Sequence, residues 1–479
     1  MSGRRVAVVG LGAAVAAGVW LGRLRRSTRT RRNLELARAT SRLGASAAAH
    51  RARTVFASAE RRQQLAADFE LRTAEQVAAT LGNMKGALMK LGQMASYVDE
   101  SVPEAYRAAL ANLQQDAPPM AHELAAQVVE QELGASPDRV FAEWDPVPIA
   151  AASIGQVHRA ITRDDLAVAV KVQYPGVDEA IKADLDNSDA ITGVLSLIFP
   201  GLDTKPLVQE LRDRLGEELD YRLEAANQKL FVDYYRGHPF ISIPKVVDEL
   251  STQRVLTTEL ATGARFSELD GWSQEERNLA GEAIFRFVFR SLYRMHAFNG
   301  DPHPGNYLFR PGGQVTFLDF GLVKRFTPDE IQLFESMAET LLVRRDIPGY
   351  RRILEGAGVL KPGSGMSDER TVEYFGYYYD SVLEDRTYTF TKEYASAAVE
   401  RLLPTPGTEF PEIRKFGNMP AVLVIIQRIN LGMTAVLAHL DATANWRRIG
   451  EELWPFVDGP PSTELGRKEA AWLSSADHE

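Results

Sequence analysis

A short polar stretch, Asn299 to Asn306 with the sequence N-G-D-P-H-P-G-N, constrains this chain more than any other feature, because Asp319-Phe320-Gly321 follows it closely. Asn306 and Asp319 offer the hard oxygen ligands that magnesium prefers. A triphosphate needs its charge neutralised by metal ions at a fixed distance from the reacting group, and side chains on neighbouring turns meet that need. The stretch therefore predicts a site for magnesium and a nucleotide.

Two apolar runs between these motifs predict a rigid support. Tyr307 to Phe309 and Val315 to Leu318 are separated by a turn rich in glycine and proline, which is typical of a β-hairpin. The aspartate, the asparagine five residues later and D-F-G repeat the spacing of a phosphoryl-transfer template. D-F-G alone would more often end an ordinary strand. In this order we interpret Asp301 as catalytic, and Asn306 and Asp319 as metal ligands.

Composition is that of an ordinary globular protein, with 45% hydrophobic and 25% charged residues among 479, a length that suggests two to three domains. The chain has no cysteine, which excludes disulfides, thiolate metal sites and cysteine nucleophiles. The net charge of −9 conceals an asymmetry, because residues 1–62 hold 14 arginines and 2 glutamates, a local +12 that leaves −21 for the rest. A basic end of this kind suits an anionic membrane surface or a nucleic acid.

The membrane is the better supported partner of this basic end, because no base-reading motif accompanies it. Val6 to Gly22 is an apolar run at the lower limit for spanning a bilayer, with arginines on both sides. We predict that residues 1–30 associate with a membrane, either across it or on its surface. More arginines follow the run than precede it, so the main body is expected on the cytoplasmic side. No nucleic acid partner is expected.

Residues 31–135 are predicted to form a helical extension. Within it, Met84 to Val98 repeats apolar residues at a spacing of three to four, which predicts an amphipathic helix with Lys90 and Gln93 on either side of Gly92. A glycine inside a helix costs about 1 kcal/mol relative to alanine, so Gly92 indicates a close approach to another surface. Taken alone, such a helix face is more often only solvated.

The pattern changes at Asp145, and residues 136–260 are expected to form a β-rich lobe. Ile149 to Ala160 and Leu166 to Val172 predict two strands joined by a polar turn. The second strand carries V-A-V-K, the pattern of a strand whose lysine, here Lys171, holds the α- and β-phosphates. A turn of small residues stands where a glycine-rich loop would cover the phosphates, and its methyl groups restrict backbone approach. These residues are Ala150, Ala151, Ala152 and Ser153.

A phosphate-binding lysine needs a carboxylate partner. The helical segment from about residue 205 to 235 supplies Glu218, Asp220 and Glu224. We favour Glu224 as the partner of Lys171, and Glu218 stays open as the alternative.

Strands are next expected over residues 240–247 and 254–260, and Glu259 and Leu260 fall where a hinge would contact adenine. A helix over residues 274–298 then leads back to the metal loop. The lobe that contains this helix is predicted to span residues 261–457.

After D-F-G a helix is expected to begin almost at once. Thr327 is a capping residue, Pro328 stands at the first helical position and Glu330 lies three after the cap. A long activation segment and an A-P-E motif are missing, so little chain remains to hold a peptide. Further on, the apolar run over residues 420–440 predicts a core or partner-facing helix, and residues 458–479 a mobile tail.

These motifs in this order resemble the UbiB/AarF family of atypical kinase-like proteins, which is associated with coenzyme Q and isoprenoid lipid metabolism. The resemblance covers roughly residues 80–330 and is carried by K-x-G-Q, A-A-A-S, V-A-V-K, E-x-D, D-P-H-P-G-N and D-F-G. It implies an α+β, two-lobed kinase-like fold with an N-terminal helical extension. In this family K-x-G-Q packs over the place where a protein kinase receives its peptide, which implies a regulatory role for Lys90, Gly92, Gln93, Glu218 and Asp220. Asn299 departs from the family, which usually has histidine there.

The leading interpretation is a magnesium-dependent ATPase or small-molecule kinase that acts on, or is regulated by, a prenyl lipid at a membrane. ATP and Mg²⁺ are the expected cofactors, and proteins of lipid biosynthesis are further candidate partners. Two alternatives stay open. The short segment after D-F-G argues against a protein kinase, and the retained Lys171, Asp301, Asn306 and Asp319 argue against a scaffold without turnover.

Overall fold

The computed structural model describes residues 122–152, 154–179, 181, 216–300, 303–402, 410 and 421–475. The chain divides into two compact units, and almost all of these residues belong to the second, which comprises Tyr97–Ser101, Pro119–Tyr174 and Glu217–Glu479. Several predicted features lie outside the described residues. They are the segment 1–30, the helix Met84 to Val98 with Lys90, Gly92 and Gln93, and the site residues Ser153 and Asp301.

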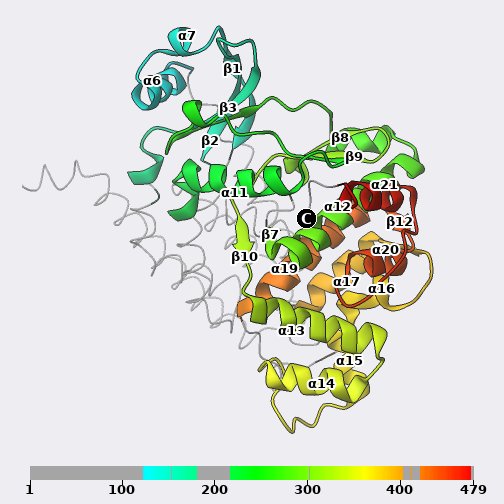
Figure 1. Ribbon diagram of the computed structural model, residues 1–479. Helices are drawn as coiled ribbons and strands as arrows, with labels where there is room; N and C mark the ends of the chain where they lie inside the picture. The colour runs from blue at the N-terminus through cyan, green and yellow to red at the C-terminus, as the bar shows by residue number, and fades with distance from the viewer. Residues whose placement is uncertain are drawn as a thin grey trace, which may run out of the picture. The chain divides into compact units, whose positions relative to one another are not determined.

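The N-terminal lobe of this unit is a four-stranded antiparallel sheet in the order β1-β2-β3-β5 (Figure 1). Its strands are β1 (Glu143–Ala152), β2 (Gly155–Ile161), β3 (Ala167–Gln173) and β5 (Val255–Glu259). Side chains alternate between the two faces of a strand, so Val168, Val170 and Val172 of β3 all enter one core and are fully buried. The same alternation turns Lys171 to the opposite face.

Two helices cover the valine face of this sheet. They are α6 (His122–Leu133) and α7 (Pro137–Val140), and Ala125, Val128 and Val129 of α6 share the core with β3. The sequence assigned residues up to 135 to a separate extension, and the structure corrects that boundary. The apolar stripe of α6 is buried by this sheet, so α6 is part of the N-terminal lobe.

The first two strands also correct the sequence prediction. Ile149 to Ala160 was expected to be one strand and Ala150 to Ser153 a turn, but Ala150 to Ala152 belong to β1, which pairs with β2 as a hairpin that places Ala152 opposite Gly155. β1 begins before Asp145 and contains Pro146 and Pro148. Proline lacks the N–H that a central strand needs, and β1 tolerates it as an edge strand with irregular register on either side of Pro148.

Gly155 is the tightest position of this sheet. A Cβ atom built on it would lie 2.2 Å from the backbone oxygen of Val172. We expect Gly155→Ala to lower the free energy of unfolding by about 1–3 kcal/mol, because the clash is with backbone and not with a side chain that could move. Denaturant unfolding measures the loss. Gly271→Ala is the matched control, since a Cβ there meets nothing within 4 Å, and equal stability of the two variants would contradict the prediction.

Helix α11 (Tyr221–Tyr234) follows, capped by Asp220. The strand predicted over residues 240–247 is wrong in most of its length. Only β4 (Ile241–Ser242) is a strand, and it pairs in parallel with β9 (Gln314–Phe317). These two strands belong to a second sheet of order β4-β9-β8-β6, where β8 is Tyr307–Arg310 and β6 is Ala264–Arg265. Beyond Pro244, Val246 makes a single bridge to Thr258.

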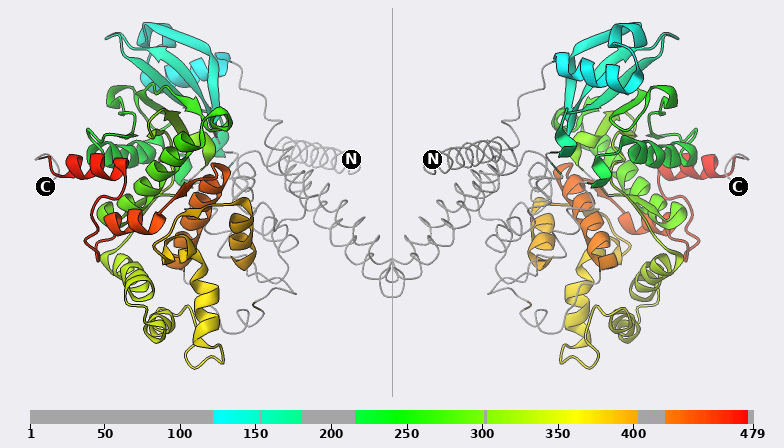
Figure 2. Two further views of the ribbon diagram at one scale, coloured as in Figure 1. Left: turned by 90° about the vertical axis from the view of Figure 1, so that its right-hand side faces the viewer. Right: turned by 90° about the vertical axis from the view of Figure 1, so that its left-hand side faces the viewer.

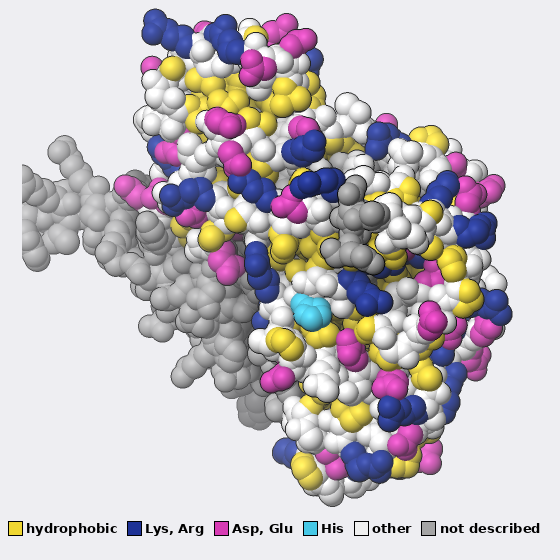
Figure 3. All heavy atoms as spheres, in the orientation of Figure 1, with side chains coloured by type: hydrophobic (Ala, Val, Ile, Leu, Met, Phe, Trp, Pro, Cys, Tyr) yellow, Lys and Arg dark blue, Asp and Glu magenta, His cyan; other side chains and the backbone are white. Residues whose placement is uncertain are grey.

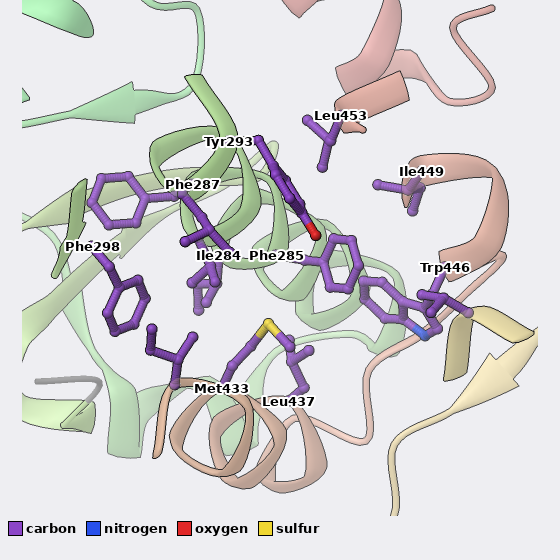
Figure 4. Packing of buried hydrophobic residues seen from close by; sticks show 14 of the residues in the cluster. Ile284, Phe285, Phe287, Tyr293, Phe298, Met433, Leu437, Trp446, Ile449 and Leu453 are labelled. Carbon is purple, nitrogen blue, oxygen red and sulfur yellow. The ribbon is translucent and has the colours of Figure 1, made fainter. Parts of the chain in front are cut away.

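The C-terminal lobe is built around α12 (Gln274–Met295), which is buried over most of its second half. Figure 4 shows its side chains packed between those of α19 (Ala421–His439) and α20 (Trp446–Leu453). The predicted helix ends three residues early, because His296 takes the left-handed conformation and β7 (Ala297–Asn299) pairs with β10 (Val323–Arg325). Within the described ranges no helix is both long and apolar enough to cross a bilayer.

The expected hairpin and the expected helix after D-F-G are both confirmed. β8 (Tyr307–Arg310) pairs with β9 (Gln314–Phe317), and Gly312 and Gly313 in the turn both take positive φ. α13 (Pro328–Ala338) begins with a complete capping box between Thr327 and Glu330. The remaining helices are α14 (Ile347–Gly356), α15 (Asp368–Phe375), α16 (Asp380–Leu383), α17 (Lys392–Leu402) and α21 (Glu464–Leu473).

The predicted mobile tail is wrong for the described part of residues 458–479. α21 (Glu464–Leu473) is an amphipathic helix that buries Leu465, Glu469 and Trp472 on one face. Figure 2 shows this last helix lying against the ordered lobes, at the end of the colour range. The glycine-proline run before it looked like the start of a tail, but the partners of α21 are more than 150 residues earlier in the chain.

Candidate functional site

Lys171 is the centre of the site. Its Nζ donates to both carboxylate oxygens of Glu224, at 2.8 and 2.9 Å, and to Oδ2 of Asp319, at 3.2 Å. The three residues come from β3, α11 and the D-F-G that follows β9. The structure thus brings together the lysine, the carboxylate that the sequence favoured as its partner, and the expected metal ligand. Glu218 lies before α11, and its backbone oxygen accepts from the Gln173 side chain at 3.4 Å.

The charges of the site hold one another in place. Burial works to lower the pKa of Lys171, but the carboxylates of Asp319 and Glu224 outweigh it, so the pKa lies well above the usual value for lysine. The Lys171 ammonium therefore carries a positive charge at neutral pH, on the face of β3 opposite the valine core. Burial raises the pKa of the Glu224 carboxyl to about 7, while the Lys171 ammonium acts in the opposite direction.

Asp319 is fixed through its backbone and its side chain. Asn299 Nδ2 donates to the Asp319 carbonyl at 2.6 Å, and Oδ1 of Asp319 accepts from Gly321 N at 2.9 Å. Asn299 is the position at which this chain departs from the family pattern, and its buried amide holds the D-F-G backbone directly. Sequence reasoning missed this role, although a polar residue two before Asp301 was the available signal.

Helix α11 also contacts the D-F-G segment. Phe320 is fully buried, with its ring centroid 4.9 Å from that of Phe231, and Asn227 Nδ2 donates to the Phe320 carbonyl at 3.2 Å. Asn227 and Phe231 lie about one and two turns after Glu224 on the same helix. One helix therefore carries the partner of Lys171 and contacts the D-F-G segment that contains Asp319.

Asn306 ends a single turn of 3₁₀ helix, Pro304–Asn306, immediately before β8. Its carbonyl accepts from Leu318 N at 3.0 Å, which ties the loop to the strand end beside Asp319. The donor set fits magnesium, because a carboxylate and an amide oxygen are hard ligands and Lys171 supplies a counter-charge for phosphate. Among the described residues no group of three or more acidic or histidine side chains could hold a metal alone.

The predicted nucleotide contacts are placed as follows. Ala150, Ala151 and Ala152 form the exposed to half-exposed end of β1, at the same end of the sheet as Gly155. The backbone N–H of Glu259 donates to Lys245 O and that of Leu260 to Ala167 O, both at 2.9 Å. The Glu259 carboxylate accepts from Lys245 N at 3.1 Å. Both backbone N–H groups of the expected adenine contacts are therefore bonded within the lobe.

Asp220 has a structural task that the sequence did not assign. Its side chain accepts from the backbone N–H of Arg222 and forms a two-pronged ion pair with the Arg222 guanidinium, at 2.9 and 2.7 Å. The hydrogen bond from Arg222 lowers the pKa of Asp220. Asp220 thus caps α11 four residues before Glu224, whose carboxylate contacts Lys171.

The fold and site define a protein of the kinase-like class: a β-lobe lysine paired with a helix glutamate, a helical lobe, and an aspartate of D-F-G beside the lysine. Comparison with known proteins agrees. The family model of the ABC1 atypical kinase-like domain matches residues 112–353. The chain belongs to this family, also called UbiB, and the two-lobed α+β class predicted from the sequence is confirmed.

Relatives of this chain include named atypical kinases. It is 38% identical over 256 residues to mitochondrial atypical kinase COQ8B of Rattus norvegicus, a match that covers 53% of this chain and 48% of that protein. It is 28% identical over 365 residues to mitochondrial atypical kinase COQ8 of Saccharomyces cerevisiae, covering 72% of each. The chain thus spans about half the length of the rat relative.

A solved structure is also similar. It is the complex of Rv3197 with erythromycin from Mycobacterium tuberculosis, at 32% identity and a TM-score of 0.58. The match covers 82% of this chain and 98% of that one.

Proposed function

We propose that this protein binds magnesium and ATP at the Lys171 site and releases or transfers the γ-phosphoryl group, as an ATPase or small-molecule kinase linked to a prenyl lipid such as an isoprenoid quinone. The observation that carries the proposal is the convergence of Lys171, Glu224 and Asp319, with all three Nζ contacts within 3.2 Å. The family's association with coenzyme Q metabolism supports the lipid. The relatives named as atypical kinases support phosphoryl chemistry.

Each residue has a task in this proposal. Lys171 binds the α- and β-phosphates, and Glu224 orients its ammonium. Asp319 and Asn306 would hold the magnesium ion, which neutralises phosphate charge when bound. Asp301 faces the acceptor hydroxyl or water. Ala150, Ala151, Ala152 and Ser153 cover the phosphates with less backbone approach than glycine would give.

A protein kinase is the second candidate, and one observation argues against it. Residues 322–326 alone separate D-F-G from the Thr327 cap of α13, and three of them form β10. A segment of that length has no room for an activation loop that presents a peptide. Lys90, Gly92 and Gln93, with Glu218 and Asp220, are proposed to close the substrate side, as the family resemblance implies.

Steady-state phosphate release from the purified full-length protein tests the proposed function. We expect magnesium-dependent release that rises when vesicles containing anionic lipid and a prenyl phenol are added, because lipid is the proposed substrate or regulator. A variant with Lys171→Ala serves as the blank. Binding of ATP without release under any of these conditions would favour a nucleotide-binding scaffold.

Residues 1–30 are proposed to bring the protein to the cytoplasmic side of a membrane. Deletion of residues 1–32 should release the protein from anionic vesicles, and rising salt should weaken any residual binding through screening of the remaining arginines. Sedimentation with vesicles measures both. Equal binding by the full-length and truncated proteins would place the anchor elsewhere. On the face shown in Figure 3, positive and negative side chains of the described residues are interspersed.

A further inference from the structure

The C-terminal helix α21 reaches the helix that carries Glu224. Trp472 Nε1 donates to the carbonyl of Arg236, two residues past the end of α11, at 3.1 Å. The same indole lies edge-on to His238, with ring centroids 4.4 Å apart, and its centroid is 6.3 Å from that of Tyr235. Trp472 is largely buried in this contact.

A buried ion cluster fixes α21 on the central helix α12. Glu469 accepts from Arg290 Nε at 2.5 Å and from Arg286 Nη1 at 2.8 Å. Arg286 also donates to Glu452 of α20 at 2.8 Å. Glu469 and Trp472 are three residues apart and share one helix face, so the cluster that holds Glu469 also sets the position of Trp472.

Helix α11 connects the contact of Trp472 with the site at Lys171. Glu224, Gln228, Phe231 and Tyr235 follow a spacing of three to four and are all buried, so the helix is packed along one continuous stripe. The side-chain amide of Gln228 donates to the Pro244 carbonyl at 2.6 Å. The hydroxyl groups of Tyr235 and Ser291 share a hydrogen bond of 2.8 Å. A helix of 14 residues is about 20 Å long, and a packed helix is an element through which two distant positions can be coupled.

We propose that Trp472 is a positioning residue, and that α21 sets the distance between Glu224 and Lys171 by holding the far end of α11. In kinases the lysine and glutamate pair must be in place for phosphoryl transfer. α21 lies outside the residues matched by the family model, 112–353, so this brace is not part of the shared domain. The expected effect on nucleotide affinity rests on the proposed function, whereas the contact between α21 and α11 does not.

The test uses the full-length chain and four substitutions. Trp472→Ala removes the ring and the N–H donor, and Trp472→Phe keeps a ring against His238. Leu354→Ala is a matched core control, because Leu354 is fully buried in α14, away from α11. Glu224→Gln supplies the background for a double-mutant cycle. Affinity for magnesium and ATP is measured well below each melting temperature, together with amide exchange over residues 221–234.

We expect Trp472→Ala to weaken nucleotide affinity by about tenfold, within the range for residues coupled through one network. The loss of affinity should largely vanish when Trp472→Ala is made in the Glu224→Gln background. Trp472→Phe should keep affinity within about twofold of wild type. Amide exchange in α11 should rise in Trp472→Ala. Leu354→Ala should lower the melting temperature with nucleotide affinity unchanged.

Two results would overturn the inference. The first is a Trp472→Ala protein that is less stable than wild type, but whose nucleotide affinity and amide exchange in α11 equal those of Leu354→Ala. The other is a loss of affinity of the same size in both backgrounds, which would mean that Trp472 does not act through Glu224. If wild type binds no nucleotide, the proposed function fails, and amide exchange in α11 alone decides whether α21 braces that helix.

Discussion

Asp319→Asn is expected to weaken magnesium-dependent ATP binding by about 100-fold or more. Loss of a group that merely supports a metal ligand typically costs about 10- to 100-fold in metal affinity, and Asp319 would be the charged ligand itself. The substitution keeps the shape of the side chain, and the backbone contacts from Asn299 and Gly321 can persist. Lys171 keeps both hydrogen bonds to Glu224, so the fold should be retained.

The measurement is ATP affinity by calorimetry, with magnesium and with a chelator. Asp164→Asn is the matched control, because it removes the same charge from an exposed turn between β2 and β3. Asn306→Ala should weaken binding less than Asp319→Asn, since it removes a neutral ligand. Magnesium-dependent affinity equal to wild type in Asp319→Asn would remove Asp319 from the metal site.

Glu469→Gln is expected to destabilise the fold by about 3–5 kcal/mol, the usual cost of breaking a buried ion pair by removing one partner. Glu469 and Arg286 are almost completely buried, and Arg290 is 4% exposed, so water cannot replace the lost carboxylate. Glu464→Gln is the control on the same helix, because Glu464 pairs with Lys468 at an exposed position. An exposed pair contributes about 0–1 kcal/mol. Chemical denaturation of the two variants measures the difference, and similar midpoints would contradict the burial argument.

The same carboxylate predicts a pH dependence. Burial works to raise the pKa of Glu469, but the hydrogen bond from His238 and the charges of Arg290 and Arg286 outweigh it and hold the pKa well below its ordinary value. His238 Nδ1 accepts from Ile241 N, so Nε2–H is the donor to Glu469. A group whose pKa falls on folding contributes stability above its unfolded value and loses it as the pH falls. Stability should therefore decline below about pH 4.5, and Glu469→Gln should show a shallower decline.

Much of the site could be predicted from the sequence because its signals are local. The V-A-V-K alternation places three valines in the core and Lys171 on the other face by strand geometry alone. The β8–β9 hairpin and the Thr327 cap depend on residues within a few positions of one another. Glu224 was favoured over Glu218 because it lies nearer the next strand in the chain, and the contact with Lys171 agrees.

What the sequence determined by itself was the set of chemical groups and the local elements that carry them. Only the tertiary structure decided which distant groups meet: Lys171 and Asp319 are 148 residues apart, and Arg286 and Glu469 are 183 apart. The prolines of β1, the parallel pairing of β4 with β9 and the packing of α21 escaped prediction for the same reason. An edge position, a partner strand and a buried counter-charge are properties of the assembled chain, and no short stretch of residues encodes them.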